Sequence, residues 1–269
     1  MLDAKALFNL SERTAVITGG GGALGLAIGL GLSQAGAEII VIDVNLESAR
    51  RATKNILDSG GKAHAFAGDL SQESIVEEIF AKLDKITSIN ILVNAISAPL
   101  ERPSPEKMSI DVWEKTISVN LTSFFLTSRA AAQRMIKAGK GGSIINFGSI
   151  AGVSALGRGA VAYGASKAGI IQMTRDCSFE WAQYGIRVNS ILPGQFVNET
   201  WTKLMSDPTK SNLVNRVRGG IPMGRFGEPS EMVGPVLFLA SDAASMVTGI
   251  AMPVDGGNLA MNPGATLEF

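Results

Sequence analysis

Short segments rich in β-branched residues alternate with longer helical segments, and this alternation constrains the fold more than any other feature. The predicted strands are residues 13–18, 37–42, 63–67, 89–93, 143–147, 186–191 and 250–254. Helices are predicted from a glycine turn to about residue 34, at 46–59, from Ser71 as N-cap, and at 119–138, 161–183 and 231–240. Such βαβ units with right-handed crossovers give a parallel sheet covered on both faces. The sequence therefore predicts an α/β fold of the Rossmann type, a doubly wound parallel sheet in three layers (α/β/α).

Nothing in the sequence divides this pattern into separate units. There is no repeat, linker or low-complexity segment, and 46% of the 269 residues are hydrophobic, which is enough for one sizeable core. We therefore expect a single domain over residues 1–269. Ligands of such sheets bind outside the carboxyl ends of the strands, so the residues that follow each strand are the candidates for function.

The charge and the rare residues exclude several classes of function. The 24 basic and 24 acidic residues balance, and no basic run or stripe with interleaved aromatics indicates a nucleic acid partner. His64 is the only histidine and Cys177 the only cysteine, which excludes a histidine-based metal site, a Ser–His–Asp triad and an internal disulfide. The first ten residues do not resemble a signal peptide, and no apolar stretch approaches the roughly 18 residues of a membrane span. We expect no metal, no membrane partner and a cytoplasmic location.

The first strand runs into the glycine-rich segment 19–25, which is a candidate phosphate site. Gly20, Gly22 and Gly25 fit the spacing G-x-G-x-x-G. Glycines let the backbone turn tightly and approach a pyrophosphate, and the helix that begins there offers free N–H groups and the positive end of its dipole. A plain flexible turn is the alternative interpretation of the same glycines.

Asp43 ends the second strand and bears on the choice of cofactor. A carboxylate at this place can accept hydrogen bonds from the 2′-hydroxyl of a ribose and would repel a 2′-phosphate. No basic residue lies in the glycine segment, and none follows Asp43 before Arg50. Both observations favour NAD over NADP, whereas the alternative is a solvated carboxylate that caps the next helix.

Tyr163 and Lys167 are four residues apart in a predicted helix, which places both on one face. A free phenol has a pKa near ~10, and a nearby ammonium group favours its charged form. Tyr163 can then exchange a proton with a carbinol or carbonyl oxygen while hydride moves to or from a nicotinamide. Ser149, just after the fifth strand, is placed to hold that oxygen. The sequence therefore predicts an oxidoreductase with Tyr163 as its acid/base.

These segments together resemble one known family over nearly the whole chain. The matching segments are Thr18-Gly19-x-x-x-Ala23-Leu24-Gly25, Asp43, Asp69-Leu70, Leu92-Val93-Asn94-Ala95, Asn120, Ser149, Tyr163-Gly164-Ala165-Ser166-Lys167, Arg187-Val188-Asn189-Ser190-Ile191-Leu192-Pro193-Gly194, Pro222-Met223-Gly224-Arg225, Val247-Thr248-Gly249 and Val254-Asp255-Gly256-Gly257. They resemble the short-chain dehydrogenase/reductase family in its single-domain branch of about 250 residues. The segment 222–229 also resembles members that act on polyols and sugar acids.

The resemblance implies further roles, which the residues alone do not. Lys167 would bond the nicotinamide ribose, Ser149 would orient the substrate oxygen, and Asn120 would kink its helix and hold a water in a proton relay with Lys167. The catalytic set would be Tyr163, Lys167, Ser149 and Asn120. The cofactor would bind to Gly19, Gly22, Leu24, Gly25, Asp43, Asp69, Leu70, Asn94, Ala95, Tyr163, Lys167, Pro193, Gly194, Phe196 and Asn198.

The sequence departs from the family pattern at four places. Ala23 replaces a usual glycine, and the fourth strand ends in Asn94-Ala95-Ile96-Ser97 rather than Asn-Asn-Ala-Gly. The spacing from Ser149 to Tyr163 is one residue longer than the commonest form, which adds a residue to a substrate loop. Asn198 stands where a threonine often bonds the carboxamide of the cofactor, and an asparagine can form the same kind of bond.

Three loops, residues 97–105, 150–158 and 195–225, are expected to select the substrate. Their polar residues beside a few apolar ones suit a secondary alcohol or ketone such as a polyol, sugar or hydroxy acid, with Arg102 and Arg158 expected as solvated charges. Two alternatives stay open, namely an NADPH-dependent 3-oxoacyl-thioester reductase and a catalytically silent cofactor-binding scaffold. The resemblance also implies a homotetramer, which would form through the helices 119–138 and 161–183.

Overall fold

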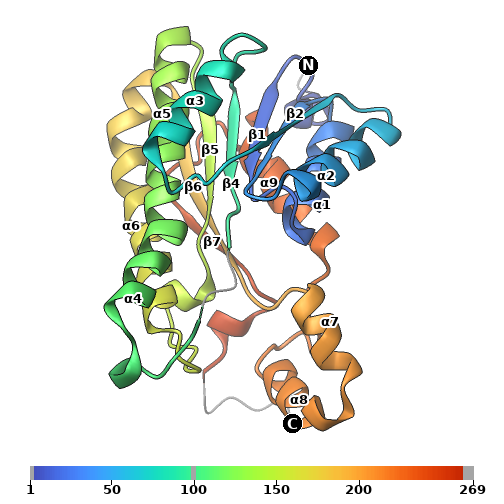
Figure 1. Cartoon of the computed structure of the whole chain (residues 1–269). Helices are drawn as coiled ribbons and strands as arrows, with labels where there is room; N and C mark the ends of the chain where they lie inside the picture. Colours follow the sequence, from blue (N-terminus) through green and yellow to red (C-terminus); the bar gives the residue numbers. More distant parts are fainter. Residues whose placement is uncertain (1–2, 98–100, 263–269) are drawn as a thin grey trace.

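Seven parallel strands form one sheet in the computed structural model, which describes residues 3–97 and 101–262. The strands are β1 (Thr14–Thr18), β2 (Glu38–Asp43), β3 (Ala63–Ala67), β4 (Ile91–Asn94), β5 (Gly142–Phe147), β6 (Ile186–Pro193) and β7 (Ala251–Val254). Their order in the sheet is β3-β2-β1-β4-β5-β6-β7, and Figure 1 labels all of these strands except β3. The chain therefore leaves β1 first toward β2 and β3 and then returns to β4 on its other side, and the predicted doubly wound α/β fold is confirmed.

Helices cover both faces of this sheet, as Figure 1 shows. They are α1 (Ala23–Gln34), α2 (Leu46–Asp58), α3 (Glu73–Leu83), α4 (Ile110–Ile117), α5 (Ser123–Ala138), α6 (Val161–Trp181), α7 (Glu199–Ser206), α8 (Ser211–Gly219) and α9 (Val233–Ala240). Helices α1, α2 and α9 lie on one face, and α3, α5 and α6 lie on the other. Among the described helices, none combines the length and the apolar character that crossing a bilayer would require.

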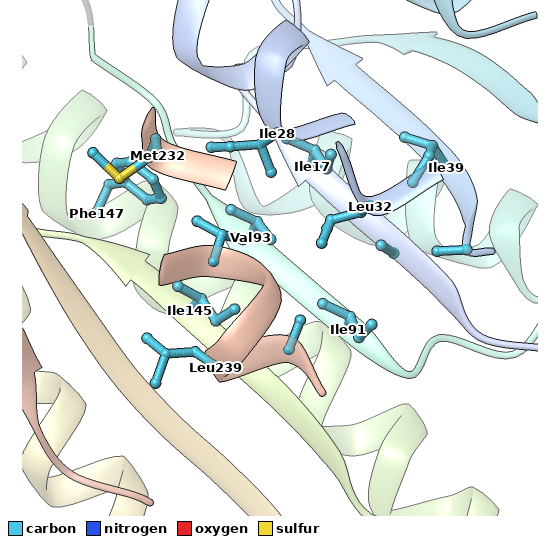
Figure 2. Packing of buried hydrophobic residues seen from close by; sticks show 14 of the residues in the cluster. Ile17, Ile28, Leu32, Ile39, Ile91, Val93, Ile145, Phe147, Met232 and Leu239 are labelled. Atoms are coloured by element: carbon cyan, nitrogen blue, oxygen red, sulfur yellow. The ribbon is translucent and has the colours of Figure 1, made fainter. Parts of the chain in front are cut away.

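Alternate residues of the central strands enter two separate cores, as the two-residue period of a strand requires. Ile17 of β1 packs with Ile28 and Leu32 of α1 on one face, which Figure 2 shows from close by. Val16, the preceding residue, belongs to the core on the opposite face, together with Phe80 of α3. Burial on both faces explains why the strands are nearly continuous apolar runs, and it makes the sheet a rigid base for the loops at its carboxyl ends.

A buried polar network lies just where β1, β4 and β5 end. The Asn94 side chain accepts hydrogen bonds from the hydroxyls of Thr18 (3.1 Å) and Thr127 (2.9 Å). It donates to the Ser128 hydroxyl and to the Asn146 side chain, each at 3.0 Å. All five residues of this network are buried, so each polar group would cost free energy without its partner. The network fixes the strand ends to one another and to α5.

Two local predictions are wrong. Helix α3 begins at Glu73 with Gln72 at its N-cap, and Ser71 does not cap it. The Ser71 hydroxyl and amide both donate to Asp69 Oδ1 (2.7 and 3.0 Å), because this carboxylate forms a tight turn with the serine before the helix can begin.

The long helix predicted at 119–138 begins earlier. Helix α4 begins at Ile110, where the Ser109 hydroxyl accepts from the Val112 amide (3.3 Å), and a π-helical turn, Ser118–Thr122, joins it to α5. The π-turn adds a residue to the helical period, which hides α4 from a search for 3.6-residue spacing.

Candidate active site

Lys167 is the most deeply buried charged group of the predicted site. The residue is 2% exposed, and its Nζ donates to the Phe147 carbonyl oxygen at the end of β5 (2.8 Å). The same Nζ lies 4.8 Å from the ring centroid of Phe124 and 5.8 Å from that of Tyr163. Burial disfavours the ammonium form, and it lowers the pKa of Lys167 from its ordinary 10.5 to about 7. At neutral pH, this amine can therefore both hold and release a proton beside Tyr163.

Ser149 follows the end of β5, in a turn that packs on the helix of Tyr163 and Lys167. It begins a 3₁₀ turn, Ile150–Gly152, and its hydroxyl accepts from the Ala151 amide (3.1 Å). This turn packs directly on α6, since a Cβ on Gly152 would lie 2.8 Å from the backbone carbon of Lys167. The glycine thus permits the close approach that brings the serine loop to the helix of Tyr163. The Ser149 hydroxyl keeps its own proton free to donate to a substrate oxygen.

Asn120 lies in the π-helical turn and has an unsatisfied side chain. It is completely buried, and neither its Oδ1 nor its Nδ2 has a hydrogen-bond partner among the described residues. Its turn is held against α6, where a Cβ on Gly169 would lie 2.8 Å from the Leu121 side chain. A buried amide without partners is costly, and a buried water is the usual remedy. The orphaned amide is therefore consistent with the predicted water relay, and it forms no direct hydrogen bond with Lys167.

The glycine segment lies between the end of β1 and the start of α1, at the same edge of the sheet. Gly19 has a φ of 68°, and a Cβ there would lie 2.8 Å from the Ala95 carbonyl oxygen of the β4 turn. The close fit of this segment places the start of α1 beside the end of β4. Gly22 is the N-cap of α1 and contributes no capping side chain, so the first amides of the helix have no side-chain acceptor. Such amides fit the pyrophosphate of a dinucleotide, which Gly22, Leu24 and Gly25 would hold.

Asp43 stands at the end of β2, beside the glycine segment. Its Oδ2 accepts from the Gly21 amide (3.1 Å) and its Oδ1 from the Asn45 amide (3.0 Å). Each carboxylate oxygen retains a further lone pair, with which Asp43 could accept a ribose hydroxyl. The Asn45 side chain, rather than Asp43, caps α2 by accepting from the Ser48 amide (3.0 Å). The alternative in which Asp43 is the helix cap is therefore wrong.

The other predicted cofactor residues line the same edge of the sheet, but several of their side chains are already engaged. The Asn94 amide is fully used in the buried network, which leaves only its backbone for a cofactor. Asp69 binds Ser71, and Leu70 is buried. The Ala95 amide donates to the Thr18 carbonyl oxygen (3.1 Å).

The loop after β6 is likewise fixed by its own contacts. The Gly194 amide, next to Pro193, donates to the Val254 carbonyl oxygen (3.0 Å). The ring of Phe196 is buried against Gly227, where a Cβ would lie 2.7 Å from it. The Asn198 side chain caps α7 by accepting from the Trp201 amide (2.9 Å), which leaves its Nδ2 free for the predicted bond to a carboxamide.

Tyr163 makes one contact that the sequence does not predict. The guanidinium carbon of Arg102 lies 4.8 Å from the centroid of the Tyr163 ring. Arg102 belongs to the predicted substrate loop 97–105, of which residues 98–100 lie outside the described residues. Nothing in the local sequence distinguishes it from any solvated arginine, because its partner is 61 residues away in the chain (163 − 102).

A family model described as Enoyl-(Acyl carrier protein) reductase matches residues 21–258. The chain belongs to the short-chain dehydrogenase/reductase family. The resemblance predicted from the motifs is thereby confirmed, and membership identifies the chain as an oxidoreductase. The roles of individual residues stay predictions.

Similar proteins extend over nearly the whole chain. It is 35% identical over 255 residues to D-threitol dehydrogenase of Mycolicibacterium smegmatis, covering 93% of this chain and 94% of that protein. It is 35% identical over 251 residues to the NAD-dependent glycerol dehydrogenase of Listeria innocua, covering 93% and 95%. A crystal structure of a gluconate 5-dehydrogenase from Burkholderia cenocepacia, in complex with NADP and tartrate, has a TM-score of 0.89 at 32% identity, covering 97% of this chain and all (100%) of that one.

The burial of Lys167 predicts a specific pH dependence of stability. Lys167 loses its proton near pH 7 in the folded protein, whereas in the unfolded chain the lysine keeps its proton until about pH 10.5. The unfolded state therefore binds more protons between these values, and this group makes the protein more stable as the pH rises through that window. Urea unfolding should show Lys167→Met as more stable than wild type at pH 6, with the difference shrinking toward pH 10.

The exposed Lys137 on α5 offers a matched control. Lys137→Met should differ from wild type by an amount that does not change with pH. An equally flat difference for Lys167→Met would mean that Lys167 keeps an ordinary pKa in the folded protein.

Proposed function

We propose that this protein is an NAD(H)-dependent oxidoreductase that interconverts a secondary alcohol and a ketone, with Tyr163 as general acid/base. The observation that carries this proposal is the amine of Lys167, buried 5.8 Å from the Tyr163 ring with its pKa lowered to about 7. A helix surface on which a tyrosine and a lysine merely happened to lie four apart would leave the lysine in water. Here the lysine is enclosed, and its single hydrogen-bond acceptor among the residues that the structure describes is a backbone carbonyl.

The proton transfers follow from this arrangement. In the oxidation, Tyr163 takes the proton of the substrate hydroxyl as the carbon–oxygen bond becomes a carbonyl, and Ser149 donates a hydrogen bond to that oxygen. The bound nicotinamide would supply the acceptor of the hydride that leaves the carbinol carbon. Lys167 stabilises the charged phenol and exchanges protons with it, and the Asn120 amide would hold the water that links Lys167 to solvent. The reverse sequence reduces the ketone.

The preference for NAD rests on Asp43. Its carboxylate faces the glycine segment and is held by two backbone amides, so a 2′-phosphate at this place would meet a fixed negative charge. The nearby Arg50 forms an ion pair with Glu47 (3.0 Å) and is therefore less available to bind a 2′-phosphate. The relatives include an NAD-dependent enzyme and a structure that contains NADP, so Asp43 is the feature that separates the two cofactors here.

The substrate class that we propose is a polyol, sugar or hydroxy acid. The relatives described above are named for threitol, glycerol and gluconate, which all carry several adjacent hydroxyl groups. A panel of alditols, aldonic acids, cyclic alcohols and 3-oxo esters, followed by the change in NADH absorbance, tests this class. Turnover restricted to 3-oxo esters with NADPH would favour the thioester reductase instead.

We further propose that the protein is a homotetramer that uses α5 and α6. Apolar side chains on these helices are exposed in the single chain, including Phe125 and Val161, and Phe179 is 84% exposed. An aromatic side chain that is this exposed to solvent favours an interface with another copy of the chain.

Tyr163→Phe tests the acid/base. The substitution removes the exchangeable proton and little else, so kcat should fall by about 100- to 10,000-fold while NADH still binds. Steady-state kinetics and a fluorescence titration with NADH measure the two quantities. Tyr184→Phe, at the only other tyrosine, should leave both near wild type. Retained turnover in Tyr163→Phe would rule out Tyr163 as the acid/base.

Asp43→Asn tests the cofactor preference. Wild type should prefer NADH over NADPH, and loss of the charge should lower kcat/KM for NADH by about 10- to 100-fold and shift the preference toward NADPH. Asp58→Asn, at the far end of α2, should change neither value. A wild type that prefers NADPH would contradict the assignment of Asp43.

Light scattering tests the assembly. Wild type at micromolar concentration should have four times the mass of the chain, and Phe179→Glu should lower it because a charge would then be buried at the interface. Leu57→Glu, an exposed apolar residue on α2, is the control and should leave the mass unchanged. A monomeric wild type is incompatible with the proposed tetramer.

A further inference from the structure

Arg102 brings a positive charge to the face of the catalytic tyrosine, and the proton transfers proposed above do not use it. Its guanidinium carbon lies 4.8 Å from the Tyr163 ring centroid. Lys167 lies 5.8 Å from the same centroid, so two cationic groups face one ring. Arg102 forms no ion pair with any residue that the structure describes. Glu106, an acid of the same segment, instead accepts a hydrogen bond from the Ser104 hydroxyl (2.6 Å).

The backbone of Arg102 is held by the turn at the end of the second predicted substrate loop, 150–158. Gly159 has a φ of 68°, and a Cβ at this position would overlap the carbonyl oxygen of Arg102. Gly157 and Arg158, which precede it, have φ angles of 64° and 56°, so three consecutive residues adopt the left-handed conformation. A non-glycine residue rarely adopts it, and Arg158 does so between two glycines. The tight turn therefore packs Gly159 against the backbone of Arg102. This contact fixes the point from which the arginine side chain extends.

A guanidinium at this place suits one kind of ligand group. Its planar fork matches a carboxylate, to which it can donate two parallel hydrogen bonds. The reacting hydroxyl of a substrate must lie at the Tyr163 oxygen, and a carboxylate a few carbons away along the same molecule would reach the space over the tyrosine ring. A neutral polyol has no group that would use this charge. The relatives described above include proteins named for both kinds of substrate.

We propose that Arg102 binds the carboxylate of a hydroxy-acid substrate and that Gly159 is the positioning residue that holds Arg102 over Tyr163. This proposal rests on the proposed function, because it assumes that Tyr163 marks the reacting carbon. It assigns the substrate class within that function as acidic sugars or hydroxy acids rather than neutral polyols.

The first test compares an acid with the corresponding neutral polyol. Wild type should have a higher kcat/KM for D-gluconate than for D-glucitol, which has the same number of carbons and no charge. Arg102→Gln should lower the ratio of the two values by about 10- to 100-fold, mainly through the KM for gluconate. The ratio for Arg102→Lys should lie between those of wild type and Arg102→Gln, because an ammonium group keeps the charge but loses the bidentate geometry. An unchanged ratio in Arg102→Gln would overturn the proposal.

Two glycines of one turn provide a matched pair for the positioning role. Gly159→Ala should displace Arg102 and lower the same ratio. Gly157→Ala introduces the same backbone strain at a φ of 64°, but its Cβ would meet nothing within 4 Å, so the ratio should stay as in wild type. Equal effects of the two substitutions would show that the contact between Gly159 and Arg102 does not position the arginine.

A binding measurement separates this proposal from the proposed function. Calorimetry with tartrate, which carries two carboxylates and two hydroxyls, is done on the complex of the enzyme with NAD. The Kd should rise by about 10-fold or more in Arg102→Gln. An equal Kd in both proteins would overturn the role of Arg102 even if wild type oxidised D-glucitol readily. If tartrate binding depends on Arg102 and the substrate panel shows no turnover, the proposed reaction fails while the anion site stands.

Discussion

The geometry of the site depends on the burial of the Lys167 amine. Removing an ammonium group from water is costly, and its partners here are one carbonyl oxygen and the faces of two aromatic rings. These contacts offset only part of the cost, since the pKa of Lys167 is still lowered to about 7. The amine can stay in this place only because β5, α5 and α6 are packed firmly around it. The chemistry of the site therefore relies on stability that is supplied elsewhere in the sheet.

Part of that stability comes from the polar network next to the site. Asn94 links β1, β4 and α5, and Asn146 extends the chain of hydrogen bonds to the Thr174 hydroxyl of α6 (3.1 Å). A network of this kind needs every member in place, because each unpaired group would be buried without water. It consequently admits one arrangement of the strand ends and of the two helices that flank them. The same arrangement sets the position of the α6 turn that carries Tyr163 and Lys167.

The elements with a strong period could be predicted from the sequence, and those that depend on an irregular backbone could not. Apolar β-branched runs gave the strands to within one or two residues, and the spacing of Tyr163 and Lys167 gave their shared face. The π-turn around Asn120 breaks the helical period, and so α4 was missed. Ser71 has the composition of a helix cap, but the carboxylate two residues before it competes for the same hydroxyl and amide. In each case, a local hydrogen bond overrode the pattern.

The substrate side of the site shows the same limit more sharply. The predicted cofactor side is built from glycines and a carboxylate at fixed distances along the chain, which a sequence displays directly. Arg102 meets Tyr163 because a left-handed turn at Gly159, near Tyr163 in the chain, contacts a loop that comes 57 residues earlier (159 − 102). No fixed spacing in the sequence marks such a contact between distant loops. It depends on a glycine, because a Cβ at that position would overlap the other loop. If Arg102 selects the substrate as proposed, selection in this fold can change through loop contacts of this kind while the proposed hydride and proton chemistry stays the same.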